Sequence, residues 1–386
     1  MDVNAVFEEQ PTIYAGSAQY KRSELNLFEL PPTDVSTLFS TEYTQCFPVV
    51  SIKENNNPLE FQTVSDQTGY LDIANSYVAL TTRIVQQDGK KCDATDVVAP
   101  SNLFFQTMWS NLEVYINGQL IIDTSNYYGY IAYIQRLLST SEIEKNNQLL
   151  DEYWYPNVKP DTYTEATDAG FKTRFTATKQ SQQFFMLGKL VGNVFNQQRY
   201  FPAGTEFRVV LKRASPAICL DCANDTKEGF NGIPYMYVID EAVMYIPKVI
   251  VSKEIINEHR EKLALNQTCL YPTNEVELKT FTIAKGLTSI TSDSLILGKM
   301  PKILVVGFVD SDAFSGKLSK SPFNFKHMNL SEIVFTWNGI TVEHRVISYS
   351  FKTANGTGTD NFLIPLRTLR KTSGTELLGN GINRNK

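Results

Sequence analysis

Short runs in which apolar and polar residues alternate make up most of the chain before residue 220. The clearest run is residues 77–85, Tyr-Val-Ala-Leu-Thr-Thr-Arg-Ile-Val, which the turn pair Asp88-Gly89 follows. A period of two with many β-branched side chains is typical of a strand that buries one face. The same pattern predicts strands at residues 41–52, 59–64, 184–190 and 207–212.

A tight β-hairpin is predicted around Asn117-Gly118. Residues 112–122 place two short apolar runs on either side of this pair. Asn-Gly readily supplies the two positive φ angles that a two-residue hairpin turn requires. This is the sharpest local prediction that the sequence makes.

Helical spacing of apolar residues interrupts the strands in residues 128–150 and predicts a helix there. A second helix is expected over residues 252–265, where Ser252 stands in the capping position. The polar stretch 156–183 is interpreted as loop. Strands are expected to resume at Glu275.

Two folded units are expected, because 386 residues exceed the size of one ordinary domain. Residues 1–24 are polar and aperiodic, which is typical of an N-terminal arm. Residues 25–220 are predicted to form a first jelly roll. Residues 221–234, rich in Asn, Gly and Pro, are the predicted linker, and residues 235–386 the second jelly roll.

An internal repeat supports this division. Residues 59–69 align without gaps on residues 276–286, at an offset of 217 (276 − 59). Residues 105–118 resemble residues 325–339, and their Asn-Gly pairs lie 221 apart (338 − 117). Two blocks in one order at nearly one offset indicate a duplicated β-domain. Many short strands without strand–helix alternation favour a sandwich or jelly roll over a parallel sheet.

The second copy is shorter than the first. Only 47 residues (386 − 339) follow its Asn-Gly pair, whereas the first copy continues for 95 residues (213 − 118) to Arg213. The second barrel is therefore expected to lack closing strands. Either the chain is a shortened one or a neighbour supplies those strands, since an unclosed barrel exposes an edge prone to strand addition.

Composition and charge exclude several classes of protein. The chain carries 36 Lys and Arg against 41 Asp and Glu, which argues against direct genome binding. Its N-terminus lacks the basic flank and apolar stretch of a secretion signal, and no apolar run is long enough to span a bilayer. Five cysteines at irregular spacing then indicate reduced thiols.

Candidate metal sites are weak. The histidines, His259, His327 and His344, do not stand in metal-binding spacing. Cys219-Leu-Asp-Cys222 has the spacing of a metal pair but no second pair, so a buried or loop thiol pair is favoured. The acidic residues of Asp310-Ser-Asp312 are interpreted as turn residues.

Candidate binding motifs are equally weak. Gly356-Thr-Gly358 lacks the strand and helix that flank a phosphate loop and is interpreted as a flexible loop. Aromatic stripes at residues 127–133 and at Phe184-Phe185 are expected in the core rather than as stacking platforms. The sequence thus predicts no catalytic residue, no cofactor-binding residue and no metal ligand, and hence a protein that is not an enzyme.

Several blocks, spread over both halves of the chain, resemble the major capsid proteins of Maverick/Polinton elements and of the related adintoviruses. The most specific are residues 305–314 and 321–330. The others are residues 30–36, 114–118, 128–138, 196–200 and 276–283.

The resemblance implies an all-β double jelly roll, two tandem eight-stranded barrels with short helices in their loops. It implies homotrimers that form pseudo-hexagonal capsomers of an icosahedral shell around double-stranded DNA. Neighbouring capsomers, penton proteins and minor capsid proteins would be the partners, and the virion the location. Family members usually continue past a segment like residues 379–384 into further strands. The alternative function is a carbohydrate-binding or carbohydrate-cleaving double jelly roll, which needs exposed aromatics or paired carboxylates in a cleft.

Overall fold

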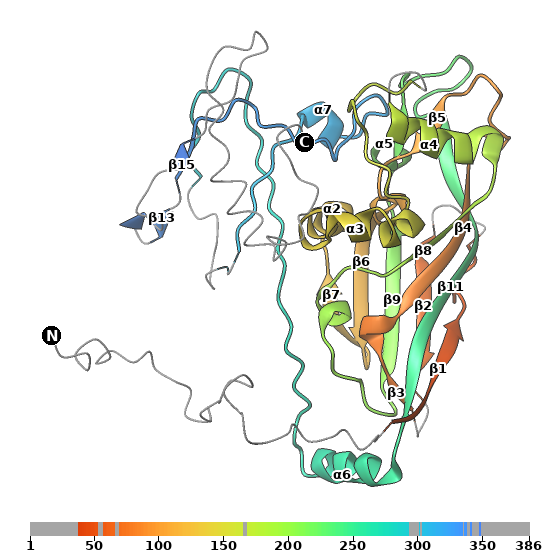
Figure 1. Ribbon diagram of the computed structural model, residues 1–386, viewed down its shortest axis with the longest axis vertical. Coiled ribbons are helices and arrows are strands. Elements are labelled where there is room, and N and C mark those ends of the chain that lie inside the picture. The colour runs from red at the N-terminus through yellow and green to blue at the C-terminus, as the bar shows by residue number, and fades with distance from the viewer. Residues whose placement is uncertain are drawn as a thin grey trace.

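The computed structural model describes residues 38–52, 57–65, 69–164, 168–292, 301, 303–334, 336–337, 340–341 and 347–348. Its main body is a sandwich of two antiparallel sheets, with helices at both ends (Figure 1). Within these residues no helix is both long and apolar enough to cross a membrane.

The first sheet has the order β1-β11-β4-β8, and the short strand β3 also pairs with β11. The second sheet has the order β2-β9-β6-β7. The strands of the first sheet are β1 (Leu38–Cys46), β11 (Tyr235–Val251), β4 (Tyr77–Gln86), β8 (Phe184–Gly188) and β3 (Gly69–Leu71). Those of the second are β2 (Leu59–Val64), β9 (Glu206–Arg213), β6 (Trp109–Ile116) and β7 (Gln119–Asp123).

This strand order is that of a jelly roll. If the eight long strands are counted along the chain, the antiparallel pairs are first with eighth, second with seventh, third with sixth and fourth with fifth. Such nested pairing, rolled into two four-stranded sheets, defines the jelly roll. The all-β prediction is confirmed, and the first unit is a complete eight-stranded jelly roll.

The predicted boundary between the two units is wrong in one respect. Residues 235–251 were assigned to the second unit, but they form β11, which lies between β1 and β4 of the first. Residues 221–234 therefore connect two parts of one unit. Without β11, the inner edges of β1 and β4 would leave their backbone groups unpaired, a loss that a buried sheet does not tolerate. The paired residues lie between 149 (235 − 86) and 213 (251 − 38) positions apart in the sequence, and local periodicity does not encode such pairing.

The core lies between the two sheets and follows the alternation of the strands. In β4 the residues Val78, Leu80, Thr82 and Ile84 point inward and are almost fully buried. Strands β2, β6 and β9 place their own apolar residues opposite. The fully buried set includes Leu59, Trp109, Leu112, Val114, Val209 and Leu211.

The Asn117-Gly118 hairpin is confirmed. Both residues have positive φ angles, and Ile116 pairs with Gln119 across the turn. In the second unit Trp337 pairs with Ile340 in the same way, within β13 (Thr336–Trp337) and β14 (Ile340–Thr341). The offset is 221 at both positions (337 − 116 and 340 − 119). The hairpin therefore recurs at the offset that the sequence repeat predicts.

Short helices gather at one end of the sandwich, which we call the crown (Figure 1). The predicted helix at residues 128–150 is confirmed in part, because α2 ends at Ser139 and a short helix follows. The predicted loop 156–183 is wrong where α4 forms. The crown contains α1 (Phe104–Thr107), α2 (Tyr128–Ser139), α3 (Glu142–Lys145), α4 (Ala169–Thr178), α5 (Pro216–Cys219), and the pair β5 (Val98–Pro100) and β10 (Leu220–Cys222).

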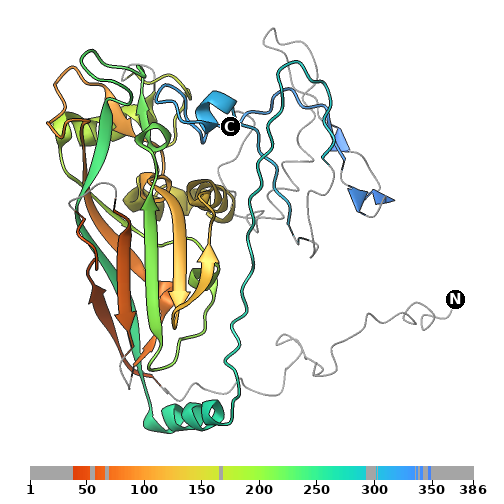
Figure 2. The same ribbon diagram turned by 180° about the vertical axis from the view of Figure 1, so that it is seen from behind.

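Helix α6 (Lys253–Ala264) confirms the helix predicted over residues 252–265 and lies at the opposite end of the sandwich (Figure 1). After it, residues 265–292, here called the connecting segment, run back toward the crown as extended chain (Figures 1 and 2). The prediction that strands resume at Glu275 is wrong for residues 276–283 and 303–309, because the described residues there pair with no neighbouring strand. Beyond them lie α7 (Ser311–Phe314), β12 (Glu332–Ile333) and β15 (Ile347–Ser348), of which β12 pairs with β15.

Candidate assembly surfaces

The cysteines are free thiols, and four of the five are buried. Burial raises the pKa of Cys92 to about 11 and that of Cys219 well above its ordinary value. A thiol held protonated in this way is a poor nucleophile and a poor metal ligand. Cys219 and Cys222 lie in α5 and β10, and both are buried, as the sequence favoured. Among the described residues, no group of three or more His, Cys, Asp or Glu side chains is placed to hold a metal ion.

The other candidate residues are scattered. His259 on α6 bonds to the Tyr70 hydroxyl, 2.9 Å from its Nδ1. His327 accepts a hydrogen bond from the backbone of Asn329. His344 and Gly356-Thr-Gly358 lie outside the described residues. Of the aromatic stripes, Tyr128 and Phe184 are buried as predicted, whereas Phe185 is exposed.

Sequence reasoning missed a buried ion pair whose acidic partner, Asp221, lies between Cys219 and Cys222 in the sequence. Arg174 of α4 contacts Asp221 of β10 at 2.9 Å, and both side chains are almost completely buried. The same guanidinium donates to the carbonyl of Pro100 at 2.7 Å, to the carbonyl of Tyr155 and to Asn157 Oδ1 at 2.5 Å. Arg174 thus ties α4 to the β5–β10 pair. The Cys-x-x-Cys spacing drew attention to this place, but no local signal marks the arginine 47 residues earlier.

Burial raises the pKa of Asp221 to about 6, although the guanidinium of Arg174 opposes the shift. The contribution of the Arg174–Asp221 ion pair to the stability of the fold therefore changes with pH near pH 6. An ion pair of this kind fixes a structure strongly but does not catalyse, since it is closed to solvent.

The second unit is attached to the crown by residues 311–326, here called the docking segment. Phe323 stacks on Tyr133 of α2, with ring centroids 4.8 Å apart, and contacts Tyr130 at 5.2 Å. Phe314 also stacks on Tyr130, with ring centroids 5.6 Å apart. Phe323 belongs to a small core with Leu103, Tyr133, Leu149 and Trp154. The aromatic residues 130 and 133 are therefore covered by the docking segment, so they neither lie wholly inside the jelly-roll core nor face solvent as a stacking surface.

Asp161 fixes the polar side of the same contact. Its carboxylate accepts from the backbone of Ser321 at 3.0 Å, from Asn324 Nδ2 at 3.0 Å, and lies 3.4 Å from Lys326 Nζ. Lys326 also bonds to Asp310 at 2.5 Å and lowers the pKa of that carboxyl. Asp310 is thus engaged by a lysine, and the absence of a metal at Asp310-Ser-Asp312 stays a prediction.

The connecting segment exposes apolar side chains. It is held at Tyr271, which stacks on Phe201 with centroids 4.5 Å apart, and at Thr280, 3.4 Å from the Tyr127 hydroxyl. Between these points Val276 lines a crevice of about 120 Å³ beside β7 and α2. Much of the remaining apolar surface faces solvent, with exposed fractions between 42% and 72% at Leu270, Val276, Phe281, Ile283, Leu287 and Ile290.

A second apolar run is also exposed. The side chains of residues 303–306, Ile-Leu-Val-Val, are 43–50% exposed. Both exposed runs carry the β-branched pattern for which the sequence predicted strands. Contiguous apolar surface of this kind marks a place where another surface binds.

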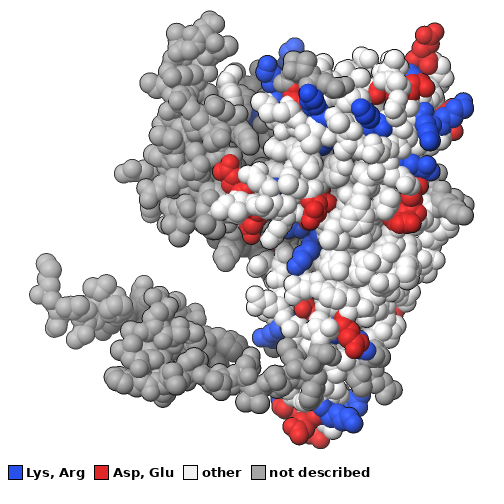
Figure 3. All heavy atoms as spheres, turned by 45° about the vertical axis from the view of Figure 1, so that its right-hand side comes forward, with Lys and Arg blue, Asp and Glu red and all other residues white. Residues whose placement is uncertain are grey.

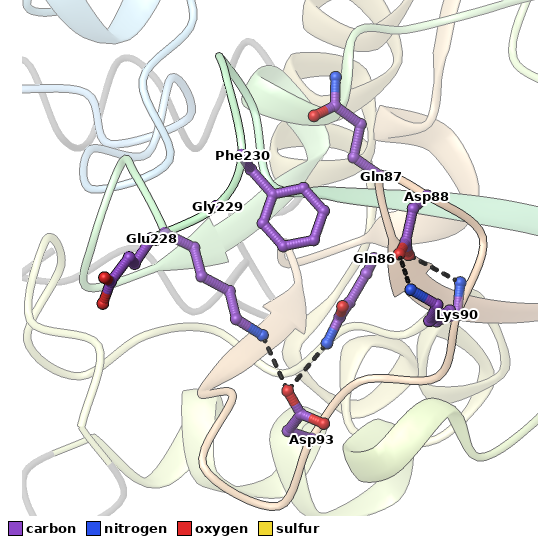
Figure 4. Close-up of a pocket in the computed structure, with 9 residues that line it drawn as sticks. Gln86, Gln87, Asp88, Lys90, Asp93, Glu228, Gly229 and Phe230 are labelled. Carbon is purple, nitrogen blue, oxygen red and sulfur yellow. Dashed lines mark hydrogen bonds and ion pairs between the residues drawn. The ribbon is translucent and has the colours of Figure 1, made fainter.

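An open depression of about 770 Å³ lies beside the end of β4 and residues 227–230 (Figure 4). It is lined by Phe230 and by carboxylates, which are the groups that a carbohydrate site requires. Yet Asp93 accepts from Lys227 and Gln86, both at 3.1 Å, as Figure 4 shows. Asp96 behind it bonds to Lys227 at 2.7 Å and to the Tyr235 hydroxyl at 2.9 Å.

These bonds occupy the carboxylates of Asp93 and Asp96. Burial raises the pKa of Asp96, but hydrogen bonds from Lys227, from the backbone N–H of Asp93 and from Tyr235 outweigh it, so that its pKa is lowered. It is held ionised and paired, so it is not available as a general acid. The arrangement therefore does not favour the carbohydrate-cleaving alternative.

Comparisons with known proteins give weak likenesses. No family model matches the chain. A curated Caenorhabditis elegans protein, "Uncharacterized protein F54H12.2", is 22% identical over 315 residues, which cover 79% of this chain and 72% of the relative.

Three solved viral structures are also similar. A chain of the Sputnik virophage structure is 14% identical at a TM-score of 0.40, covering 61% of this chain and 53% of its own. The PBCV-1 capsid model is 13% identical at 0.36, covering 57% and 44%. The mavirus major capsid protein is 13% identical at 0.33, covering 64% and 54%. The chain spans about half the length of these structures. At TM-scores this low, the jelly-roll assignment rests on the strand order, and the resemblance to Maverick and Polinton elements stays a prediction.

Proposed function

We propose that the chain is a structural subunit of a viral capsid. Copies associate into trimers, and the trimers tile a closed shell. The observation that carries the proposal is the jelly-roll order of the eight strands. Jelly rolls serve chiefly in capsids, lectins and cupins, so the choice lies among these.

Two of the three uses fit the described residues poorly. A cupin holds a metal inside its barrel, but here the space between the sheets is filled by apolar side chains. A lectin needs free polar groups around an aromatic platform, but Asp93 of the depression is bound by Lys227 and Gln86, and Asp88 by Lys90. A capsid subunit needs apolar surface for its neighbours, and the connecting segment offers it.

The recurring hairpin supports a second jelly roll. Trp337 pairs with Ile340 at the offset of 221 that relates the two sequence blocks. Two similar units in each chain give a trimer six near-equivalent units, which is the geometry of a pseudo-hexagonal capsomer. The proposed partners are further copies, then penton and minor capsid proteins, without sequence-specific binding of nucleic acid, and the proposed location is the virion.

Self-association is the first testable consequence. The chain has a mass of 43.6 kDa, so a trimer has 130.8 kDa (3 × 43.6). Light scattering of the full chain at micromolar concentration is expected to give this mass or a multiple of it. Because apolar contacts strengthen in kosmotropic salt, ammonium sulfate is expected to favour the larger species. A mass of one chain at every concentration would contradict the proposal.

A further inference from the structure

The sheet β1-β11-β4-β8 has an unusual outward face. An antiparallel sheet with one face in the core normally presents polar residues on the other face, where it meets water. Here the central row across three strands is Val243, Ala79 and Leu187, in direct register. All three side chains are only half-buried, so they face outward rather than into the sandwich.

Aromatic side chains lie on both sides of this row. Tyr77 stacks on Tyr245 with centroids 4.9 Å apart, and Tyr43 contacts Tyr77 at 5.8 Å. Phe185 of β8 is 61% exposed. We call this set of outward residues the outer face: Tyr43, Tyr77, Ala79, Phe185, Leu187, Val243 and Tyr245.

Charged side chains lie mainly at the two ends of the outer face, but one of them, the exposed Glu241, lies in register with Thr81 and Phe185, one row from Val243, Ala79 and Leu187. Arg83 and Asp240 form an ion pair at 3.3 Å toward the crown. Glu42 and Lys248 lie in register toward the opposite end. Figure 3, which brings the side with β1 and β11 forward, shows a broad middle with few charged groups. Both borders contain both signs, so the outer face does not select a strongly acidic or basic partner such as nucleic acid.

The size of the outer face matches a protein interface. Strand β4 has 10 residues. At ~3.4 Å per residue and ~4.8 Å between four strands, the sheet face measures roughly 34 by 19 Å, or about 650 Å². A stable protein–protein interface buries ~800 Å² on each partner. The outer face with its border therefore has the area that one such contact needs.

We infer that a second copy of this chain packs on the outer face. An uncharged centre with aromatic residues is the composition of a homo-oligomer interface. This inference rests on the proposed function and adds the surface through which the copies meet. The centre of the contact is the row Val243, Ala79 and Leu187, because hot spots lie at the middle of an interface.

The test places a charge on the outer face of the full chain. Val243→Lys and, separately, Phe185→Lys are compared with Val64→Lys, which puts the same charge on an exposed valine of the other sheet. Phe185 is already exposed, so its variant tests the contact without disturbing the core. Each outer-face variant is expected to weaken self-association about 100-fold in sedimentation experiments, while Val64→Lys associates like the wild type. Melting curves check that all three fold.

The outcomes separate this inference from the proposed function. If the wild type associates and the folded Val243→Lys and Phe185→Lys variants associate equally well, the outer face is not the contact, and the capsid role is untouched. If Val64→Lys dissociates as much as they do, the effect is not specific to the outer face and the inference also fails. A wild type that remains monomeric overturns the proposed function and this inference together.

Discussion

Replacing Arg174 with Met is expected to destabilise the jelly roll by about 3–5 kcal/mol at pH 8, because Asp221 is then left as a buried, uncompensated charge. Carbonyls of Pro100 and Tyr155 also lose their donor. Chemical denaturation followed by fluorescence measures the effect. Lys172→Met, on an exposed position of the same helix, is the control and is expected to change stability by less than about 0.5 kcal/mol.

The penalty depends on pH with a definite sign. The folded-state pKa of Asp221 is raised to about 6, above the ~3.9 of an unfolded aspartate, so its favourable contribution is present below pH 4 and lost as pH rises through 6. Removing Arg174 takes away the cation that opposes this rise. The pKa then moves further up, and the variant is expected to lose more stability at pH 8 than at pH 5.

A double variant separates the ion pair from simple packing. Arg174→Met combined with Asp221→Leu removes both charges and is expected to recover much of the stability lost by Arg174→Met alone. Equal stability of wild type and Arg174→Met at pH 8 would show that the pair does not hold α4 to β10. A penalty that is the same at pH 5 and pH 8 would show that Asp221 does not titrate there.

Replacing Phe323 with Ala is expected to detach the docking segment without unfolding the jelly roll. The ring is buried against Tyr133 and Tyr130, and truncating a buried phenylalanine costs about 3–5 kcal/mol. That energy corresponds to roughly 100-fold or more in the population of the detached state. Limited proteolysis is expected to cut within residues 311–326 faster by this factor, while fragments of the jelly roll persist.

Met328→Ala is the matched control, because Met328 lies just beyond the docking segment and is 48% exposed. Its cleavage rate is expected to equal that of the wild type. If Phe323→Ala is cut no faster than this control, the aromatic contact does not attach the second unit. If it unfolds the whole chain in one step, the docking segment does not detach independently of the jelly roll.

Local features of the fold were readable from the sequence. The hairpin at Asn117-Gly118 follows from the φ angles that this pair accepts, and β4 and β9 follow from their alternation. These signals succeed because turn chemistry and strand period act between neighbours in the chain. The sequence repeat at an offset of 221 is also seen in the structure, because Trp337 pairs with Ile340 as Ile116 pairs with Gln119.

Features that depend on distant partners were not readable. β11 reads as a strand, but only its pairing with β1 and β4 assigns it to the first unit. Helix α4 shows little separation of apolar and polar faces, since one of its buried residues is Arg174, whose partner Asp221 is 47 positions away. Residues 276–283 have the pattern of a strand but no partner strand among the described residues, and a strand without a partner does not form.

For the candidate functional surfaces too, local features could be predicted from the sequence, whereas features that depend on distant strands could not. Sequence reasoning interpreted Asp310-Ser-Asp312 as turn residues, and the structure places Asp310 beside Lys326. It did not find the outer face, since the residues of the central row come from β4, β8 and β11. Each of these strands alternates normally when viewed alone. Only the register shows that their outward apolar residues form one row.

The central claim is that this chain builds a shell from copies of itself. Electron microscopy of the purified full chain, first in negative stain and then frozen, tests it most directly. The account predicts three-fold particles with six towers, alone or joined into closed shells, in which β1, β11, β4 and β8 face a neighbouring copy. A uniform population of single chains at micromolar concentration, each with an uncovered outer face, would contradict it.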